Sequence, residues 1–502
     1  MSEQLQAQLD LLPGYLSSHL LISLSALGIG LLICLPLAVV VTRVQSLHWP
    51  TLTFASVMQT IPGIALLALM VPLLATIGFL PALVALVLYS MLPILRNTVT
   101  GILEVDPNLI EAADGLGMTS MQKLFRVELP LAAPVIIAGI RTSTVWVVGT
   151  ATLSTPVGAT SLGNFIFPGL QTQNATAVLV GSAAAAGLAI VLDQLIRLIE
   201  VASQRRSKGL GLAALSVLAV LIVFGLMPKI MTLTADRDRP TVVVGTKQFT
   251  EQYILGELIS RTLDRAGFTV DLRPGLGTTV LFDAISDGSI DCYVDYSGTI
   301  WSNVMNRTDN PSADSVMSAV TRRLDSDFEI LCLGPLGFEN AYALAARGRL
   351  CDSLGISSIS DLASHANSLV LGTDYDFPSR PEWASVRDRY GLAFDEIRQF
   401  DATLMYTAIG QGEVDVISAY STDGRIADLD LLVLEDPFEA FPPYDAVILL
   451  SPRARHNENL TNALSGLIES ISDDAMRQSN RRVDVDNETI SAAADYLEER
   501  MK

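Results

Sequence analysis

The sequence is poor in the residues that build metal and redox centres. It has four histidines and four cysteines in 502 residues, scattered without the spacing that a metal site requires. No Gly-x-x-x-x-Gly-Lys-Ser/Thr loop occurs, so the chain carries no phosphate-binding motif for hydrolysing ATP. It has no basic patch of the kind that binds nucleic acid. The composition therefore predicts no metal, no cofactor, no enzymatic centre and no nucleic-acid partner.

Charged residues are also scarce, at 17% of the chain, and they are unevenly distributed. Residues 1–230 hold 10 Lys or Arg and 9 Asp or Glu, which leaves 23 of the 33 basic and 44 of the 53 acidic residues for 231–502. Half of all residues are hydrophobic. A near-neutral apolar half and a strongly acidic half predict a membrane domain followed by a soluble globular domain.

Six apolar segments occur in the first half, and most approach the ~20 residues that a helix needs to cross a bilayer. The first has no basic n-region and no small-residue cleavage site, so we expect a retained helix rather than a signal peptide. We expect five membrane helices within 1–208, and a sixth helix with a linker in 209–239. The segments are Leu21–Val41, Phe54–Leu74, Leu80–Leu95, Leu131–Val148, Ala177–Ile196 and Leu210–Leu226.

The distribution of Lys and Arg predicts the orientation of these helices, because cytoplasmic loops are enriched in both. The N-terminal tail and the loops 75–79 and 149–176 contain neither residue, so we place them outside. The chain is then a multi-pass protein of the plasma (inner) membrane, with its acidic domain on the extracytoplasmic side. The basic residues of the other loops are Arg43, Arg96, Lys123, Arg126, Arg197, Arg205, Arg206 and Lys208.

Arg141 lies inside the fourth apolar segment, where a charge is costly. Two interpretations remain open. The side chain faces the bundle interior or a water-filled pathway, or it forms a structural ion pair or carbonyl contact between helices.

The long loop that carries Lys123 and Arg126 contains Glu111-Ala112-Ala113-Asp114-Gly115-Leu116-Gly117, followed by Val127-Glu128-Leu129-Pro130. We expect Glu111 to begin a short helix, Gly117 to allow a sharp turn and Pro130 to open the next membrane helix. In spacing and in the final Leu-Pro, the segment resembles the EAA loop of ABC importer permeases. The resemblance implies docking onto a separate ATP-binding subunit through Glu111, Ala112, Ala113, Gly117, Leu129 and Pro130.

Beyond residue 240 the pattern changes to alternating strands and helices, which predicts an α/β domain. We expect a buried strand over 241–245 and a helix over 250–266 with Thr250 as its N-cap. A set of residues also recurs with an offset of 124. It runs Thr279, Ala284-Ile285, Gly288, Asp291, Tyr296 and Ser297, then Thr403, Ala408-Ile409, Gly412, Asp415, Tyr420 and Ser421.

This repeat predicts two related lobes, lobe 1 at about 240–337 and 441–502 and lobe 2 at about 338–440. The chain crosses between them near 337–341 and 436–442, where we expect the hinge. Ligands of open α/β sheets bind beyond the carboxyl ends of the strands. We therefore expect Tyr296 and Tyr420 to face each other across a cleft.

Six motifs in 240–502 together resemble the glycine betaine/carnitine/choline-binding proteins of osmoprotectant importers, and the first half looks like that family's permease. The resemblance implies an all-α, type I ABC-importer-like permease fused to a two-lobed, type II periplasmic-binding-protein domain. It also implies a homodimer of the chain, surrounded by membrane lipid. The motifs are Thr246–Tyr253, Asp295–Thr299, Asn340–Leu344, Phe377–Pro381, Ala419–Arg425 and Phe441–Tyr444.

The same resemblance implies a site for a small quaternary ammonium ligand. A trimethylammonium group has no N–H donor, whereas aromatic faces attract it through their quadrupole. The cage would consist of Tyr296, Tyr342, Tyr420 and Tyr444. Lys247, Thr299 and Arg380 would hold the ligand's carboxylate, with Gln248 lining the cleft.

Other readings remain open at this stage. Ergothioneine is also a trimethylammonium betaine, but its imidazole-thione would need a further polar partner such as Glu251, Asp374 or Asp376. Carnitine is a further alternative, while choline lacks a carboxylate and would leave Arg380 and Lys247 unmatched. A membrane-anchored sensor or ligand-gated pore is a different class, although no cytoplasmic output domain is visible. Three cysteines face an oxidising compartment, so at least one stays unpaired; a Cys332–Cys351 bridge is one option that the sequence leaves open.

Overall fold

The computed structural model describes residues 3–172, 174–205, 207–234, 239–307, 309–375 and 377–501. The chain divides into two compact units. One holds 1–167 and 176–237, and the other holds 238–502 together with the short segment 168–175. The first is helical and the second mixes strands with helices, so the predicted fold class is confirmed. Part of the predicted linker, residues 235–238, lies outside the described residues.

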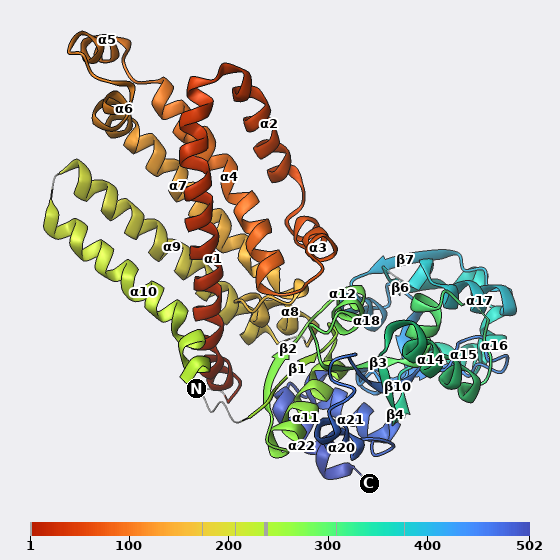
Figure 1. The fold of residues 1–502 in the computed structure, drawn as a ribbon. Coiled ribbons are helices and arrows are strands. Elements are labelled where there is room, and N and C mark those ends of the chain that lie inside the picture. The colour runs from red at the N-terminus through yellow and green to blue at the C-terminus, as the bar shows by residue number, and fades with distance from the viewer. Residues whose placement is uncertain are drawn as a thin grey trace. The chain divides into compact units, whose positions relative to one another are not determined.

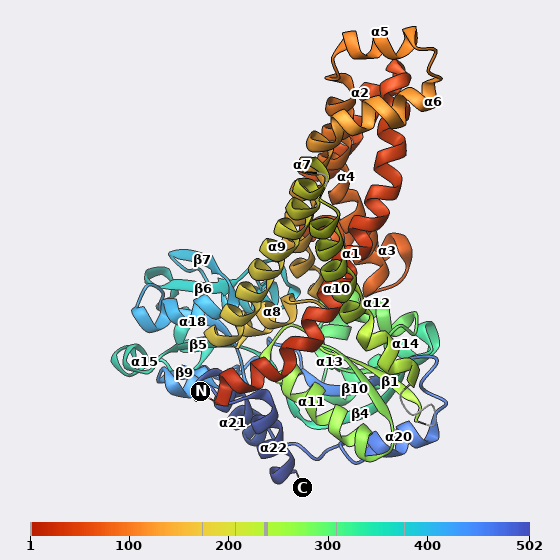
Figure 2. The same ribbon diagram turned by 90° about the vertical axis from the view of Figure 1, so that its left-hand side faces the viewer.

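In the helical unit, long helices run beside one another and the short α5 and α6 lie at one end of the bundle (Figures 1 and 2). The closest packing joins α4 to α7 and to α1. The α-helices are α1 (Glu3–Arg43), α2 (Gln45–Thr60), α3 (Gly63–Leu74), α4 (Phe79–Leu103), α5 (Pro107–Gly115), α6 (Ser120–Lys123), α7 (Leu129–Ala151), α8 (Gly163–Gln171), α9 (Ala175–Gln204) and α10 (Lys208–Thr234).

Among the described residues of this unit, five stretches of helix are long and apolar enough to cross a membrane: Gln8–Arg43, Phe79–Leu103, Ser120–Val157, Ala175–Ala202 and Lys208–Met227. The predicted single helix over 54–74 is wrong. That segment is divided between α2 and α3, which are bent by 103°. Ile61 precedes Pro62 and adopts an extended conformation, because proline disfavours the helical conformation of the residue before it.

The bend bears on the predicted orientation. The unit has up to six spans if the bent pair α2–α3 counts as one. The structure places Arg43 at the end of α1 and Arg96 within α4 rather than in loops. The predicted alternation requires the pair α2–α3 to cross as one span, because the segments that carry these two arginines are both predicted to be cytoplasmic. The orientation remains a prediction.

The loop with the EAA-like motif is helical over most of its length. Glu111 does not begin a helix as predicted. Instead α5 begins four residues earlier at Pro107, where the Asp106 side chain caps it by accepting a hydrogen bond from Asn108 N at 2.9 Å. Gly117 has φ +71°, which fits the predicted turn after α5.

Helix α7 is continuous with the preceding segment through a π-helical turn over Leu124–Glu128, in which Leu129 N donates to Leu124 O. Pro130 is the second residue of α7, but the helical stretch already begins at Ser120, so Pro130 does not open this helix as predicted. The predicted coupling residues therefore occupy the second half of α5, the turn that follows it and the first turn of α7.

Arg141 of α7 forms a two-point ion pair with Asp193 of α9. Its Nε donates to Oδ1 at 2.8 Å and its Nη2 to Oδ2 at 3.0 Å. Of the two interpretations left open for Arg141, the structure supports the interhelical ion pair.

The α/β unit contains two five-stranded sheets with equivalent strand orders. Lobe 1 has the order β2-β1-β3-β10-β4 and lobe 2 the order β7-β6-β8-β5-β9. In each, three neighbouring strands are parallel and the fourth is antiparallel. The strands are β1 (Thr241–Gly245), β2 (Thr269–Arg273), β3 (Cys292–Tyr296), β4 (Leu331–Glu339), β5 (Tyr342–Arg347), β6 (Val370–Asp374), β7 (Glu396–Phe400), β8 (Val416–Tyr420), β9 (Leu431–Val433) and β10 (Asp445–Leu450).

The internal repeat is present in three dimensions. Asp291 accepts a hydrogen bond from Val243 N at 2.8 Å in lobe 1, and Asp415 accepts one from Val370 N at 3.0 Å in lobe 2. In each case the aspartate directly precedes one strand, β3 or β8, and binds a backbone N–H of the neighbouring parallel strand, β1 or β6. The two lobes are therefore built from equivalent elements, as the 124-residue offset in the sequence predicts.

Helices surround both sheets, and their apolar faces form the core with the strands. Helix α11 begins at Thr250 with Phe249 as N-cap, so the prediction of Thr250 as N-cap is wrong. The helices of four or more residues are α11 (Thr250–Arg265), α12 (Thr278–Ser286), α14 (Ala313–Phe328), α15 (Gly348–Leu354), α16 (Ile359–Ala363), α17 (Pro381–Tyr390), α18 (Ala402–Gln411), α19 (Arg425–Asp428), α20 (Glu458–Ser465), α21 (Asp473–Asp484) and α22 (Ile490–Arg500).

The chain crosses between the lobes twice, through 340–341 after β4 and through 434–444 before β10. The two crossings are joined where Asn340 N donates to Tyr444 O at 3.0 Å. The possible disulfide is not formed, since Cys332 and Cys351 are both free. They lie in β4 and α15, which belong to different lobes.

Candidate functional site

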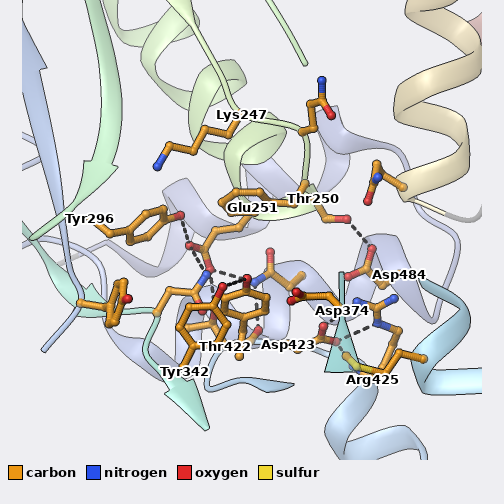
Figure 3. Close-up of a pocket in the computed structure, with 18 of the residues that line it drawn as sticks. Lys247, Thr250, Glu251, Tyr296, Tyr342, Asp374, Thr422, Asp423, Arg425 and Asp484 are labelled. Atoms are coloured by element: carbon orange, nitrogen blue, oxygen red, sulfur yellow. Dashed lines mark hydrogen bonds and ion pairs between the residues drawn. The ribbon is translucent and has the colours of Figure 1, made fainter. Parts of the chain in front are cut away.

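One pocket of the α/β unit brings together all eight residues that the sequence assigned to ligand binding (Figure 3). Two of them, Tyr296 and Tyr420, are the last residues of the equivalent strands β3 and β8. The pocket thus lies at the carboxyl ends of the parallel strands, where the fold predicts a ligand. The eight are Lys247, Gln248, Tyr296, Thr299, Tyr342, Arg380, Tyr420 and Tyr444.

Three of the four tyrosines form one aromatic cluster. Tyr342 and Tyr420 are directly opposed on β5 and β8, with ring centroids 4.7 Å apart. Tyr420 Oη donates to Tyr342 Oη at 2.8 Å. The Tyr444 ring lies edge-on to Tyr342 at 5.8 Å, and its hydroxyl donates to Glu382 of α17. Strand pairing therefore sets two of these rings, and the crossing segment before β10 adds the third.

Arg380 adds a cation beside this cluster. It is the N-cap residue of α17, and its guanidinium carbon lies 5.3 Å from the ring centroid of Tyr342. A positive group beside an aromatic cluster can hold the carboxylate of a zwitterion while the rings hold its cationic end.

Tyr296 belongs to the other side of the pocket. Its ring packs at 6.1 Å from that of Phe249, and its hydroxyl donates to Glu251 Oε1 at 2.5 Å. It also accepts from Gln252 Nε2 at 3.0 Å. Burial raises the pKa of Tyr296 well above its ordinary value, so the ring is a neutral phenol. Tyr296 therefore lines the pocket from lobe 1. The aromatic cluster of Tyr342, Tyr420 and Tyr444 belongs instead to lobe 2 and to the crossing segment before β10.

Lys247 is only 4% exposed and forms a buried ion pair with Asp295. Asp295 also accepts hydrogen bonds from Tyr293 Oη at 2.5 Å and from Tyr296 N at 2.7 Å. Asp295 already compensates the charge of Lys247. A ligand carboxylate would therefore have to compete with Asp295 for this lysine. Its predicted role stays a prediction.

The two remaining predicted residues are polar groups of lobe 1. Gln248 donates from its side-chain amide to Gly275 O at 2.9 Å, which fixes its orientation at the pocket wall. Thr299 ends the short helix Ser297–Thr299 after β3. Their contact with a ligand stays a prediction.

A buried carboxylate, Glu251, lines the pocket. Four side chains donate to it: Tyr296 and Asn340 to Oε1, and Thr422 and Asn480 to Oε2. Burial raises its pKa, while these hydrogen bonds act in the opposite direction. The sequence named Glu251 as a cleft-lining residue beside Lys247 and as a further polar partner, but it gave no indication of this network.

A second polar group lines the pocket beyond Glu251, and we call it the polar end: Thr250, Asp423, Arg425 and Asp484 (Figure 3). Arg425 pairs with Asp423 through two hydrogen bonds, of 2.9 and 2.5 Å, and its guanidinium stacks 3.9 Å from the Tyr406 ring centroid. The pair with Arg425 outweighs burial and lowers the pKa of Asp423. Thr250 Oγ1 donates to Asp484 at 2.5 Å, and burial raises the pKa of Asp484 to about 7.

Sequence reasoning did not assign most of these polar residues to the pocket. A signal was available for Thr422, Asp423 and Arg425, because they lie within five residues of Tyr420 at the end of β8. Asn480 and Asp484 lie on α21, far along the chain, with no motif that marks them. Asp374 lines the pocket as well, whereas Asp376 lies outside the described residues.

Comparison with known proteins covers both units. Residues 240–499 match the family described as the substrate binding domain of ABC-type glycine betaine transport systems, and residues 30–227 match the binding-protein-dependent transport system inner membrane component. The ergothioneine transport permease/ergothioneine binding protein EgtU of Helicobacter pylori (strain G27) is 32% identical over 461 residues, which cover 88% of this chain and 82% of that protein.

Two further relatives each match one unit. The choline transport system permease protein OpuBB of Bacillus subtilis (strain 168) is 46% identical over 36% of this chain and 83% of its own length. A glycine-betaine-binding protein of Pseudomonas aeruginosa is 34% identical over 52% of this chain and 88% of its own length. The chain therefore belongs to the binding-protein-dependent ABC import systems, as an inner membrane permease fused to a substrate-binding domain of the glycine betaine type.

Proposed function

We propose that the chain captures a trimethylammonium zwitterion of the glycine betaine type and passes it through its own permease. The observation that carries this proposal is the cluster of Tyr342, Tyr420 and Tyr444 beside Arg380 in one pocket. Each ring contributes about 0.5–2 kcal/mol toward a desolvated cation. Several rings and one ion pair thus supply much of the ~8 kcal/mol that a micromolar site needs.

Ergothioneine is the second candidate, and the polar end of the pocket is the observation that favours it. Glycine betaine consists of the trimethylammonium and carboxylate groups alone, and it has no further group for Asp423, Arg425 and Asp484. Ergothioneine carries both groups and an imidazole-thione in addition. The relative that spans both units is named for ergothioneine, which supports the same candidate. Choline, without a carboxylate, would leave Arg380 unmatched.

The rest of the machinery is proposed from family membership. ATP hydrolysis takes place on a separate subunit, which contacts the permease through Glu111, Ala112, Ala113 and the turn at Gly117. Two copies of the chain form one transport pathway, and the binding domain lies on the extracytoplasmic side. Fusion keeps the binding domain at a high effective concentration near the mouth of its permease.

Calorimetry on the purified full-length chain in lipid nanodiscs tests the ligand assignment. The panel is glycine betaine, carnitine, choline and ergothioneine, titrated at equal ionic strength. We expect micromolar or tighter binding of at least one zwitterion and weaker binding of choline. Absence of binding for all four would refute the proposal, and preference for choline would refute the role of Arg380.

Uptake separates the importer from a sensor. Cells that express the chain with an ATPase of the same import family should accumulate the labelled zwitterion against its gradient. Binding without ATP-dependent uptake would instead favour the membrane-anchored sensor.

A further inference from the structure

Glu251 forms hydrogen bonds with both lobes of the α/β unit and with the first segment that crosses between them. Its Oε1 accepts from Tyr296 Oη at 2.5 Å and from Asn340 Nδ2 at 3.1 Å. Its Oε2 accepts from Thr422 Oγ1 at 2.6 Å and from Asn480 Nδ2 at 3.1 Å. Figure 3 shows its carboxylate between the Tyr296 hydroxyl and the Thr422 side chain. The residue is 2% exposed, so this network replaces water almost completely.

The four donors come from three different parts of the unit. Tyr296 ends β3 and Asn480 lies on α21, both in lobe 1, as is Glu251 itself. Asn340 lies in the first crossing segment. Thr422 follows β8 in lobe 2. A rotation of lobe 2 about the crossing segments moves Thr422 relative to lobe 1, so the bond between Thr422 and Glu251 directly reports the separation of the lobes.

A carboxylate suits this place better than a carboxamide. All four partners donate, and an ionised carboxylate can accept at both oxygens. The Asn480 amide has little freedom to turn, because its Nδ2 also donates to Thr422 O at 2.9 Å. Replacing Glu251 by glutamine would direct an NH2 group at one of the two pairs of donors. The hydroxyl of that pair can turn to accept, whereas the Asn Nδ2 of the same pair would face an NH2 group instead of an acceptor. Burial of Glu251 without these donors would be strongly unfavourable.

We propose that Glu251 is a positioning residue that fixes the Tyr296 ring against the pocket and holds the two lobes in the arrangement of this structure. It sets how long a captured cation remains bound. The ligand part of the proposal rests on the proposed function, whereas the lobe arrangement does not. Tyr296 lines the pocket, and Thr422 belongs to the opposite lobe. The Glu251 carboxylate therefore links the orientation of the Tyr296 ring to the closure of the two lobes.

The test uses the full-length chain in lipid nanodiscs with Glu251→Gln. Glycine betaine and ergothioneine serve as probes, and stopped-flow fluorescence gives their association and dissociation rates. Spin labels on one surface position of each lobe give the distance between lobes with and without probe. A lost charged hydrogen bond corresponds to roughly a 10- to 100-fold change. We expect dissociation to accelerate by about that factor, association to change less than about threefold, and the ligand-free distance distribution to broaden.

Two further variants separate this role from general damage. Glu257→Gln makes the same chemical change on the same helix, at a surface pair with Arg261, and should match the wild type. Thr422→Val removes only the donor from lobe 2 and should reproduce part of the faster dissociation. In the double variant of Glu251 and Thr422 the effects should not add, because both remove the same bond.

Wild-type dissociation rates and distances in both Glu251→Gln and Thr422→Val would overturn the proposal. So would faster dissociation without any change in the ligand-free distance. If Glu251→Gln does not fold, Thr422→Val alone decides by the same criteria. If the wild type binds neither probe, the proposed function is wrong, and the ligand-free distances of the variants still decide whether Glu251 holds the lobes.

Discussion

The aromatic cluster predicts that Tyr420→Leu weakens binding through the loss of a charge interaction rather than of contact area. Tyr420 is half-buried and lies 4.7 Å, centroid to centroid, from Tyr342. Leucine keeps much of the apolar volume but has no quadrupole. Removing one desolvated cation–π contact costs about 1–2 kcal/mol, which is a factor of roughly 5 to 30 in Kd.

The matched control is Tyr420→Phe. It keeps the aromatic face and removes only the hydroxyl that donates to Tyr342 at 2.8 Å. That hydrogen bond contributes about 1 kcal/mol to the stability of the fold. We expect the Phe variant to bind within about threefold of the wild type and to unfold at a slightly lower temperature.

The assay compares glycine betaine with 3,3-dimethylbutanoate, which replaces the quaternary nitrogen by carbon and keeps the carboxylate. Calorimetry on the wild type should show a clear preference for the cation. In Tyr420→Leu that preference should shrink by about the same factor of 5 to 30. If Tyr420→Leu weakens the binding of both ligands equally, the Tyr420 ring contributes only apolar contact area. The charge-based reasoning is then refuted.

Three other perturbations test separate parts of the structure. Burial raises the pKa of Asp484 to about 7, above about 4 in the unfolded chain, so its contribution to stability falls as pH rises from about 4 to about 7. Asp484→Asn should remove this pH dependence from the melting temperature. Curves of melting temperature against pH that run parallel for the variant and the wild type would contradict the prediction. Gly117→Val, at φ +71°, should abolish uptake and leave calorimetric binding intact, whereas Gly117→Asn should be tolerated; normal uptake in the Val variant argues against a coupling turn. Arg141→Met should destabilise the detergent-solubilised chain by about 1–3 kcal/mol, and Asp193→Leu should partly restore it, whereas additive losses would exclude their ion pair.

The sequence alone predicted the architecture from local signals, and its resemblance to the glycine betaine-type binding proteins indicated the eight residues that line the pocket. Apolar length and strand–helix alternation are properties of short windows, and the 124-residue offset paired the two lobes. Tyr296 and Tyr420 end equivalent strands, and strand ends meet at one edge of a parallel sheet. These relations follow from backbone geometry, so residue order was enough to predict them.

Tertiary structure decided the details that depend on distant partners. The break between α2 and α3 turned an expected single helix into a bent pair. Lys247, which reads as a free cation, is already paired with Asp295. Thr250, which reads as a cap, donates to Asp484 on α21.

Glu251 shows the same limit most clearly. Its donors lie 45, 89, 171 and 229 residues away in the chain, so no local pattern marks them. A buried carboxylate is tolerated only where several donors converge on it, and their convergence is a property of the packed lobes. The sequence therefore indicated eight of the residues that line the pocket. The tertiary structure added the polar residues that the sequence missed, and it decided which residues already have partners and which link the two lobes.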